Sequence, residues 1–140
     1  MIEIDVRRTI PAPADAVWSE LRSFEGIENW LAMIAHSEVR GDGAGATRVC
    51  TTVDGGRLVE RLEEVDDGER RLVYTIQEAP MPLQDYRSTM RVLPDGQDAS
   101  TVVWSATFDA PDDAAEQLES TMRGVYESGL DGLRASFGGA

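Results

Sequence analysis

The chain has 140 residues, of which 41% are apolar and 28% are charged, which fits one globular domain with a sizeable core. Its net charge is −13 at pH 7, and a surface this acidic repels nucleic-acid phosphates, so we expect no nucleic-acid partner. No apolar run approaches the roughly 20 residues that span a bilayer, so we expect no membrane insertion. The chain opens directly on an alternating pattern without a cleavable leader, and we expect a cytoplasmic protein.

The counts of cysteine and histidine limit the chemistry that the chain can carry. A single cysteine, Cys50, excludes an internal disulfide bond and is typical of a reducing compartment. A single histidine, His36, leaves too few ligands for a structural zinc site, and it makes a Cys/His nucleophilic pair improbable. We therefore expect no metal and no cofactor.

Short alternating segments fill most of the chain. Alternation of apolar and charged residues predicts a first strand over 2–10, which Pro11 and Pro13 end. Apolar spacings of three and four then predict two short helices, at 15–21 and 24–30, the second with Ser23 as its N-cap. Six more strands are predicted between turn residues, at 35–40, 47–53, 57–65, 71–77, 86–93 and 100–108.

The last long segment, 112–137, has apolar residues every three or four positions and predicts one amphipathic helix. Gly129 lies near the middle of its buried face, where it either lets a strand approach closely or leaves room beneath the helix. Together the elements predict a single α+β domain over 1–137 and a loose tail at 138–140. A curved seven-stranded antiparallel sheet wrapped around the long helix would enclose a cavity, with the helix as its wall and possible moving part.

Several short motifs occur in an order that resembles a known family. They are Ile10-Pro11-Ala12-Pro13 with Val17-Trp18, Trp30, Glu60-Arg61-Leu62 with Asp66, Tyr74-Thr75-Ile76, Pro82 with Tyr86, Val103 to Phe108, and Tyr126 to Leu133. With the order of elements, they resemble the polyketide cyclase/dehydrase-like branch of the START/Bet v 1-like (SRPBCC) superfamily, a large group of small bacterial ligand-pocket proteins. The resemblance implies a helix-grip fold with a ligand pocket. Because this fold carries cyclases, lipid carriers, hormone receptors and chaperone-binding modules, it leaves the function open.

Strand parity predicts which side chains face the cavity. Tyr86, Ser88 and Met90 share one side of their strand, and Tyr74 and Trp104 are assigned to the same side of theirs. Pockets for small molecules combine apolar and aromatic walls with few polar groups. The expected ligand contacts are Trp30, Thr51, Glu60, Tyr74, Tyr86, Ser88, Met90, Trp104, Met122, Val125 and Tyr126.

The hairpin around Gly55-Gly56 is expected to place one charged group inside. If these glycines form a two-residue turn, Thr51 lies opposite Glu60, and both Arg48 and Cys50 point outward. Glu60 then lies on the apolar inner face, where a carboxylate needs a hydrogen-bond partner or water. It is either a structural group or a polar anchor and general acid or base in a pocket.

Three functions remain open. The first is binding of a hydrophobic or aromatic small molecule, polyketide- or lipid-like, in the cavity between the sheet and the C-terminal helix. The second is a polyketide cyclase/dehydratase in which Glu60 and a pocket tyrosine, Tyr86, move protons. The third is an acidic protein-interaction module with a filled cavity, for partners that the sequence does not identify. The resembled cyclases use an inward arginine or histidine, and the expected register offers none, which favours binding over catalysis.

Overall fold

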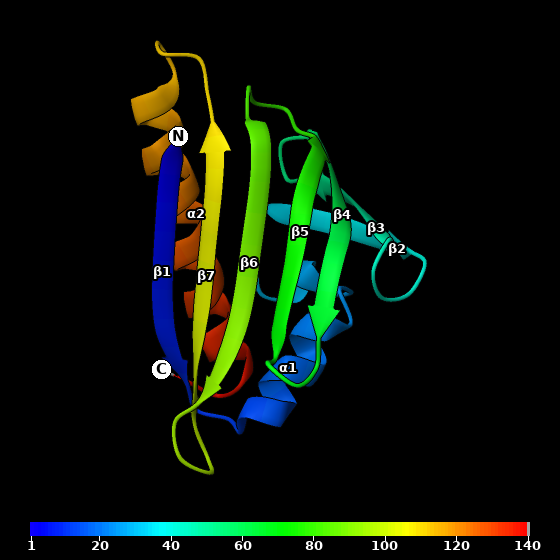
Figure 1. Ribbon diagram of the computed structural model, residues 1–140, viewed down its shortest axis with the longest axis vertical. Helices are drawn as coiled ribbons and strands as arrows, with labels where there is room; N and C mark the ends of the chain where they lie inside the picture. The colour runs from blue at the N-terminus through cyan, green and yellow to red at the C-terminus, as the bar shows by residue number, and fades with distance from the viewer. Residues whose placement is uncertain (140) are drawn as a thin grey trace.

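Seven antiparallel strands form one sheet in the order β1-β7-β6-β5-β4-β3-β2 (Figure 1). The structure is a computed structural model that describes residues 1–139. The strands are β1 (Ile2–Ile10), β2 (Ile34–Arg40), β3 (Thr47–Thr52), β4 (Arg57–Asp66), β5 (Arg71–Glu78), β6 (Gln84–Pro94) and β7 (Ser100–Asp109). The helical elements are α1 (Ala14–Arg22), the 3₁₀ turn η1 (Ile27–Asn29) and α2 (Ala115–Ser136). The expected α+β helix-grip architecture is therefore confirmed.

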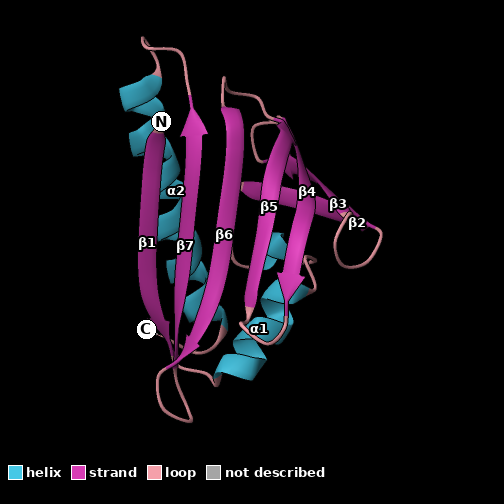
Figure 2. Ribbon diagram, in the orientation of Figure 1, coloured by secondary structure: helices cyan, strands magenta, loops and turns pink. Residues whose placement is uncertain are grey.

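The helices lie on one side of the sheet, as Figure 2 shows. α2 runs along β1 and β7, whereas α1 lies at the lower ends of β4 and β5 in this view and contacts β6 and β7. Alternate residues of β7 from Ser100 to Phe108 are buried, which matches a strand with one face on the core. The core therefore fills the space between the inner face of the sheet and the helices.

The connection after α1 differs from the sequence prediction. Only Ile27–Asn29 forms a helical turn, because Phe24 and Gly26 adopt left-handed conformations with φ of 64° and 73° that interrupt the predicted second helix. Ser23 is the C-cap of α1 and donates a hydrogen bond to the carbonyl of Glu20 at 2.9 Å, so its prediction as an N-cap is wrong. This irregular segment carries Phe24 to the inner face of the sheet.

The last helix begins later than predicted, at Ala115, because residues 112–114 form a turn before it. At its other end, the amides of Gly138 and Gly139 donate hydrogen bonds back to helix carbonyls, and the rest of the predicted tail, residue 140, lies outside the described residues. Within the described residues, no helix combines the length and apolar character needed to cross a membrane.

Strand β4 is irregular on both sides of Arg61. Leu62 pairs with Tyr74 and Glu64 pairs with Val73, so Glu63 is an extra residue, a β-bulge. A second irregularity opposite Val59 and Glu60 lies on β5. Because of the bulge, Glu60 and Leu62 face the core while Glu64 is exposed.

Candidate functional site: a small cavity with a buried ion pair

A small cavity lies between the inner face of the sheet and α2, with a volume of about 40 Å³. That is room for about one water molecule, whereas pockets for drug-sized ligands measure roughly 300–1,000 Å³. The cavity is bounded by Ile27, Leu31, Met33, Ile34, Leu58, Glu60, Tyr74, Ile76, Met81, Leu83, Tyr86, Trp104, Met122, Val125 and Tyr126.

The lining divides into two zones by exposure. Its half-buried members are all apolar and form what we call the mouth: Met33, Leu58, Ile76, Met81, Leu83 and Val125. Its polar side chains are all buried and form what we call the polar floor: Glu60, Tyr74, Tyr86 and Tyr126. An apolar, partly solvated entrance therefore leads to buried oxygen atoms.

The charged group of the floor, Glu60, is held by a buried arginine. Nε of Arg48 donates to Oε1 of Glu60 at 2.7 Å, and the two side chains are only 6% and 4% exposed. Oε1 also accepts a weak bond from Sγ of Cys50 at 3.7 Å. No described residue donates to Oε2 of Glu60. Among the side-chain N and O atoms of residues 1–139, only Ser100 Oγ is both fully buried and without a hydrogen-bond partner. Oε2 of Glu60, which also lacks a partner, therefore keeps a small accessible surface.

Phe24 supports the other side of the arginine. Nη1 of Arg48 donates to the Phe24 carbonyl at 3.2 Å, and the guanidinium carbon lies 3.8 Å from the centre of the Phe24 ring. The left-handed conformation of Phe24 is uncommon for a bulky residue and brings carbonyl and ring to the same cation. Arg48 is therefore held from both sides.

The ion pair changes the acid–base behaviour of its neighbours. Burial by itself would lower the pKa of Arg48, but the charge and hydrogen bond of Glu60 more than offset it, so this pKa lies above its usual value. Burial, and then the negative charge of Glu60, raise the pKa of Cys50 to about 12. Cys50 is therefore a protonated, unreactive thiol at neutral pH.

The contacts of Ser88 determine which hydroxyl group donates to which in the network on the floor. Ser88 Oγ donates its proton to the Ser105 carbonyl at 3.0 Å, so it accepts from Tyr126 Oη at 2.8 Å and from Trp104 Nε1 at 3.0 Å. Tyr126 has then used its proton and accepts from Tyr86. Tyr86 thus has no proton left to donate, and its oxygen offers only acceptor capacity.

The remaining tyrosine completes this network. Tyr74 Oη accepts from Trp104 Nε1 at 3.2 Å and keeps its own proton. Burial, and then the charge of Glu60, raise the pKa of Tyr74 to about 12. Burial also raises the pKa values of Tyr86 and Tyr126 well above their usual range. All three phenols are therefore neutral near pH 7.

Aromatic stacking closes the wall beneath α2. The rings of Trp104 and Tyr126 are stacked, 3.8 Å apart between centroids, and Trp30 meets Trp104 edge-on at 5.7 Å. A Cβ built on Gly129 would lie 2.8 Å from the Trp104 ring, and one on Gly132 would lie 2.0 Å from the Trp30 carbonyl oxygen. These glycines therefore serve close approach and leave no room beneath the helix, which makes this half of α2 a fixed wall.

The structure brings most of the expected contacts together. Seven of them line the cavity: Glu60, Tyr74, Tyr86, Trp104, Met122, Val125 and Tyr126. Ser88 lies behind them in the hydroxyl network, and Trp30 and Met90 line a separate small hollow that also includes Arg48. Thr51 is exposed and does not belong to the site.

The misplacement of Thr51 follows from the wrong hairpin register. Thr51 pairs with Arg57, and Arg48 pairs with Glu60, a shift of three residues from the expected register. The turn is not two glycines: Thr52 bonds to Gly56 across three residues, and only Gly55 has a positive φ, 90°. Because the shift is odd, every β3 side chain changes face. Arg48 and Cys50 therefore point inward and are buried, against the prediction.

Sequence reasoning missed the inward cation, Arg48, and its support, Phe24. A signal for Arg48 was available, because an inward Glu60 without a partner is costly and calls for a cation on a neighbouring strand. Of the mouth residues only Val125 was among the expected contacts, and three of the others, Met33, Met81 and Leu83, lie in loops outside any periodic pattern. No group of three or more metal-ligating side chains gathers within residues 1–139.

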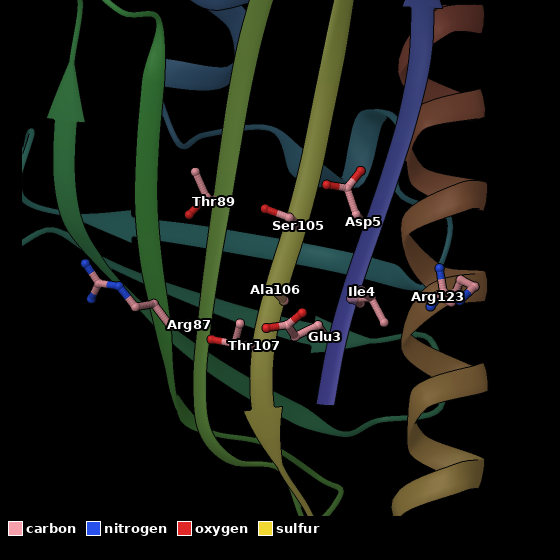
Figure 3. A pocket seen from close by; sticks show the side chains of 9 residues that line it. All are labelled: Glu3, Ile4, Asp5, Arg87, Thr89, Ser105, Ala106, Thr107 and Arg123. Carbon is pink, nitrogen blue, oxygen red and sulfur yellow. The ribbon is translucent and has the colours of Figure 1, made fainter. Parts of the chain in front are cut away.

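A second hollow lies on the outer face of the sheet and has a different character. It has a volume of about 400 Å³ and is bounded by charged and hydroxyl side chains of β1, β6 and β7, with Arg123 of α2 at its edge (Figure 3). Glu3, Asp5 and Arg87 are exposed there. Ile4 and Ala106 are the apolar members of its lining, and none of the charged or hydroxyl side chains there is buried. The inner cavity, with its apolar mouth and buried polar floor, is therefore the candidate site.

Comparisons with known proteins agree with this architecture. The chain is 30% identical over 122 residues to the abscisic acid receptor PYL2 of Arabidopsis thaliana, which covers 80% of this chain. It spans 64% of the length of that receptor. Among solved structures it resembles XoxI from Bacillus cereus, with a TM-score of 0.89, 30% identity, and coverage of 98% of this chain and 96% of the other.

A more distant neighbour has the same fold. Norcoclaurine synthase from Thalictrum flavum, solved with dopamine and hydroxybenzaldehyde, superposes with a TM-score of 0.78 at 19% identity, covering 96% of this chain and 84% of the other. The family model described as "Polyketide cyclase / dehydrase and lipid transport" matches residues 1–138. The chain therefore belongs to this family, within the START/Bet v 1-like superfamily.

Proposed function

We propose that the protein binds a hydrophobic or aromatic small molecule in the cavity between the sheet and α2. The observation that carries this proposal is the combination of a half-buried apolar mouth with a buried polar floor. A core that serves folding alone has no need to leave a carboxylate oxygen without a partner on a cavity wall. Membership of a family of ligand-binding helix-grip proteins supports the same reading.

Binding requires the cavity to expand, because about 40 Å³ does not hold a multi-ring ligand. The mouth is suited to this. Met33 and Met81 are half-buried, and unbranched thioether side chains change rotamer at low cost. The fixed part is the wall at Gly129 and Gly132, so we expect a ligand to displace mouth side chains rather than the C-terminal half of α2.

Proton-transfer catalysis by Glu60 and Tyr86 has weaker support than binding. Tyr86 donates its proton to Tyr126, and burial raises its pKa well above the usual range. Such a phenol gives up its proton poorly at neutral pH. Glu60 is committed on one oxygen to Arg48, which leaves a single oxygen for a ligand. These contacts favour holding a molecule in place over transforming it.

An acidic interaction module with a filled cavity is the other candidate, and the small cavity volume favours it. The two functions differ in what they require of the mouth. A binding protein takes up an apolar probe there in a saturable way, whereas an interaction module does not. A test of mouth occupancy therefore separates them.

The experiment is a fluorescence titration with N-phenyl-1-naphthylamine, a neutral apolar probe that brightens in apolar surroundings. We expect saturable binding to the wild-type protein. Val125→Trp fills the mouth and should abolish that binding. Ser128→Trp adds the same bulk to an exposed position of α2 and should leave it unchanged. Thermal melts of both variants check that each is folded.

Two results would contradict the proposal. One is the absence of saturable probe binding to the wild-type protein. The other is equal binding by wild type and a folded Val125→Trp variant, which would place the probe elsewhere. Native mass spectrometry of gently purified protein adds an independent measurement of a retained small molecule.

A further inference from the structure

The charge pattern of the cavity restricts the chemical class of its ligand, given the binding function proposed above. Glu60 is the one charged residue among the side chains that line the cavity in the described chain. Arg48, its partner, does not line the cavity but borders the separate hollow with Phe24, Leu72 and Met90. The ion pair is therefore oriented, with its negative end toward the cavity and its positive end behind.

The polar atoms of the floor that have capacity left are mainly hydrogen-bond acceptors, so they also favour a ligand that donates. Oε1 of Glu60 accepts from Arg48 and Cys50, whereas Oε2 has no hydrogen-bond partner within residues 1–139 and keeps a small accessible surface. The proton of Tyr86 is used within the hydroxyl chain to Tyr126, so its oxygen is a second acceptor. Tyr74 keeps the one unassigned hydroxyl proton, and it carries no charge.

We infer that the ligand is an apolar or aromatic molecule with a hydrogen-bond donor at one end, a protonated amine or a hydroxyl group, and that it is not a carboxylic acid. A protonated amine would donate to Oε2 of Glu60 in a charge-assisted hydrogen bond, the strong kind in a site of low dielectric. A carboxylate would face Glu60 without a cation to offset the repulsion, because Arg48 lies behind Glu60 and does not line the cavity. A hydroxyl group would donate to Glu60 and accept from Tyr74.

The test uses three probes of one shape: 2-phenylethylamine, 2-phenylethanol and phenylacetate. Each displaces N-phenyl-1-naphthylamine from the wild-type protein at pH 7, in buffer with enough salt to screen the net charge of −13. We expect the amine to bind at least about tenfold more tightly than the acid, as charge-assisted hydrogen bonds predict, with the alcohol between them. An acid that displaces the fluorophore as well as the amine does would overturn the inference.

Two matched variants locate the effect. Glu60→Gln should reduce the difference between amine and acid to about threefold or less and retain the alcohol, because a single charge-assisted hydrogen bond has been removed. Glu64→Gln removes the same charge from the exposed face of the same strand and should leave the wild-type order unchanged. If Glu64→Gln changes the order as much as Glu60→Gln does, the preference comes from the overall surface charge and the inference is wrong.

The outcomes keep the two proposals apart. Failure of the fluorophore itself to bind would overturn the binding function and this inference with it. Binding of the fluorophore with an acid preference would overturn this inference alone. The wild-type ranking needs no variant, so a Glu60→Gln protein that fails to fold leaves the test intact.

Discussion

Strand β4 carries two glutamates whose ion pairs lie in opposite surroundings. Glu60 meets Arg48 at 2.7 Å with side chains 4% and 6% exposed, whereas Glu64 meets Arg87 at 3.3 Å with side chains 50% and 51% exposed. Water solvates the outer pair whether or not it forms, so little depends on it. The inner pair has lost that water, so each partner depends on the other. The same two residue types are therefore optional on one face and interdependent on the other.

The largest expected effect comes from breaking the inner pair. Arg48→Met leaves the Glu60 carboxylate buried and unpartnered, and we expect the free energy of unfolding to fall by about 3–5 kcal/mol. Denaturant titration at pH 7 measures this change. Removing both charges, in Arg48→Met with Glu60→Leu, should restore much of the loss. A double variant as unstable as the single one would show that the ion pair, and not the orphaned charge, matters.

Two glycines of α2 give a similar comparison between a packed position and an exposed one. Gly132→Ala places a Cβ where the Trp30 carbonyl oxygen lies 2.0 Å away, and a backbone atom cannot yield easily. We expect a loss of about 1–3 kcal/mol from overpacking. Gly124→Ala meets nothing within 4 Å and should stabilise the helix by about 1 kcal/mol at most. Thermal or denaturant melts compare the two, and a loss of stability in Gly124→Ala would contradict this reading.

The alkaline pH dependence of stability tests the inner surroundings of Cys50. Its folded-state pKa of about 12 lies above the ordinary value of 9.0, so the unfolded chain releases the thiol proton first. This contribution to stability is fully present below pH 9 and decreases as the pH rises toward 12. The unfolding free energy of wild type should therefore fall more steeply above pH 9 than that of Cys50→Ala. Parallel pH profiles would show an unperturbed thiol.

The smallest effect is expected from the outer pair. Arg87→Met should change the free energy of unfolding by less than about 1 kcal/mol, because both side chains stay solvated. Added salt should reduce even this difference. A loss comparable to that of Arg48→Met would mean that exposure does not separate the two pairs.

The sequence was sufficient for the architecture and for three strands of the site. Tyr74, Ser88 and Trp104 lie inside as parity predicts, because their segments of β5, β6 and β7 pair without interruption. Assigning side chains to a face requires only the alternation along one strand, and that alternation can be recognised in the sequence because one face of the sheet is apolar. Glu60 also lies inside as predicted, although the hairpin register from which that was argued is wrong; its alternation with Leu58 and Leu62 along β4 gives the same face.

The partner of Glu60 could not be obtained in the same way. Its identity depends on how two strands align, and that alignment depends on whether Gly55 and Gly56 form a two-residue turn or the three-residue loop that is observed. The segment Asp54-Gly55-Gly56 is compatible with either the two-residue turn or the three-residue loop. Their registers differ by an odd number, so a small local choice moves Arg48 from solvent to the core. Phe24 was hidden for a related reason, since its left-handed backbone follows from tertiary contacts.

The extra residue in β4 has a consequence for how this scaffold can change shape. Leu62 and Val65 face inward on either side of the bulge, and Glu63 adds length without altering that order. Deleting Glu63 would leave a regular alternation, with each neighbouring side chain on the face that it already occupies. Bulges bend and twist the strand that carries them, so the deletion would flatten the sheet. The depth of the cavity can therefore change by insertion or deletion of one residue in β4, independently of the side chains that line it.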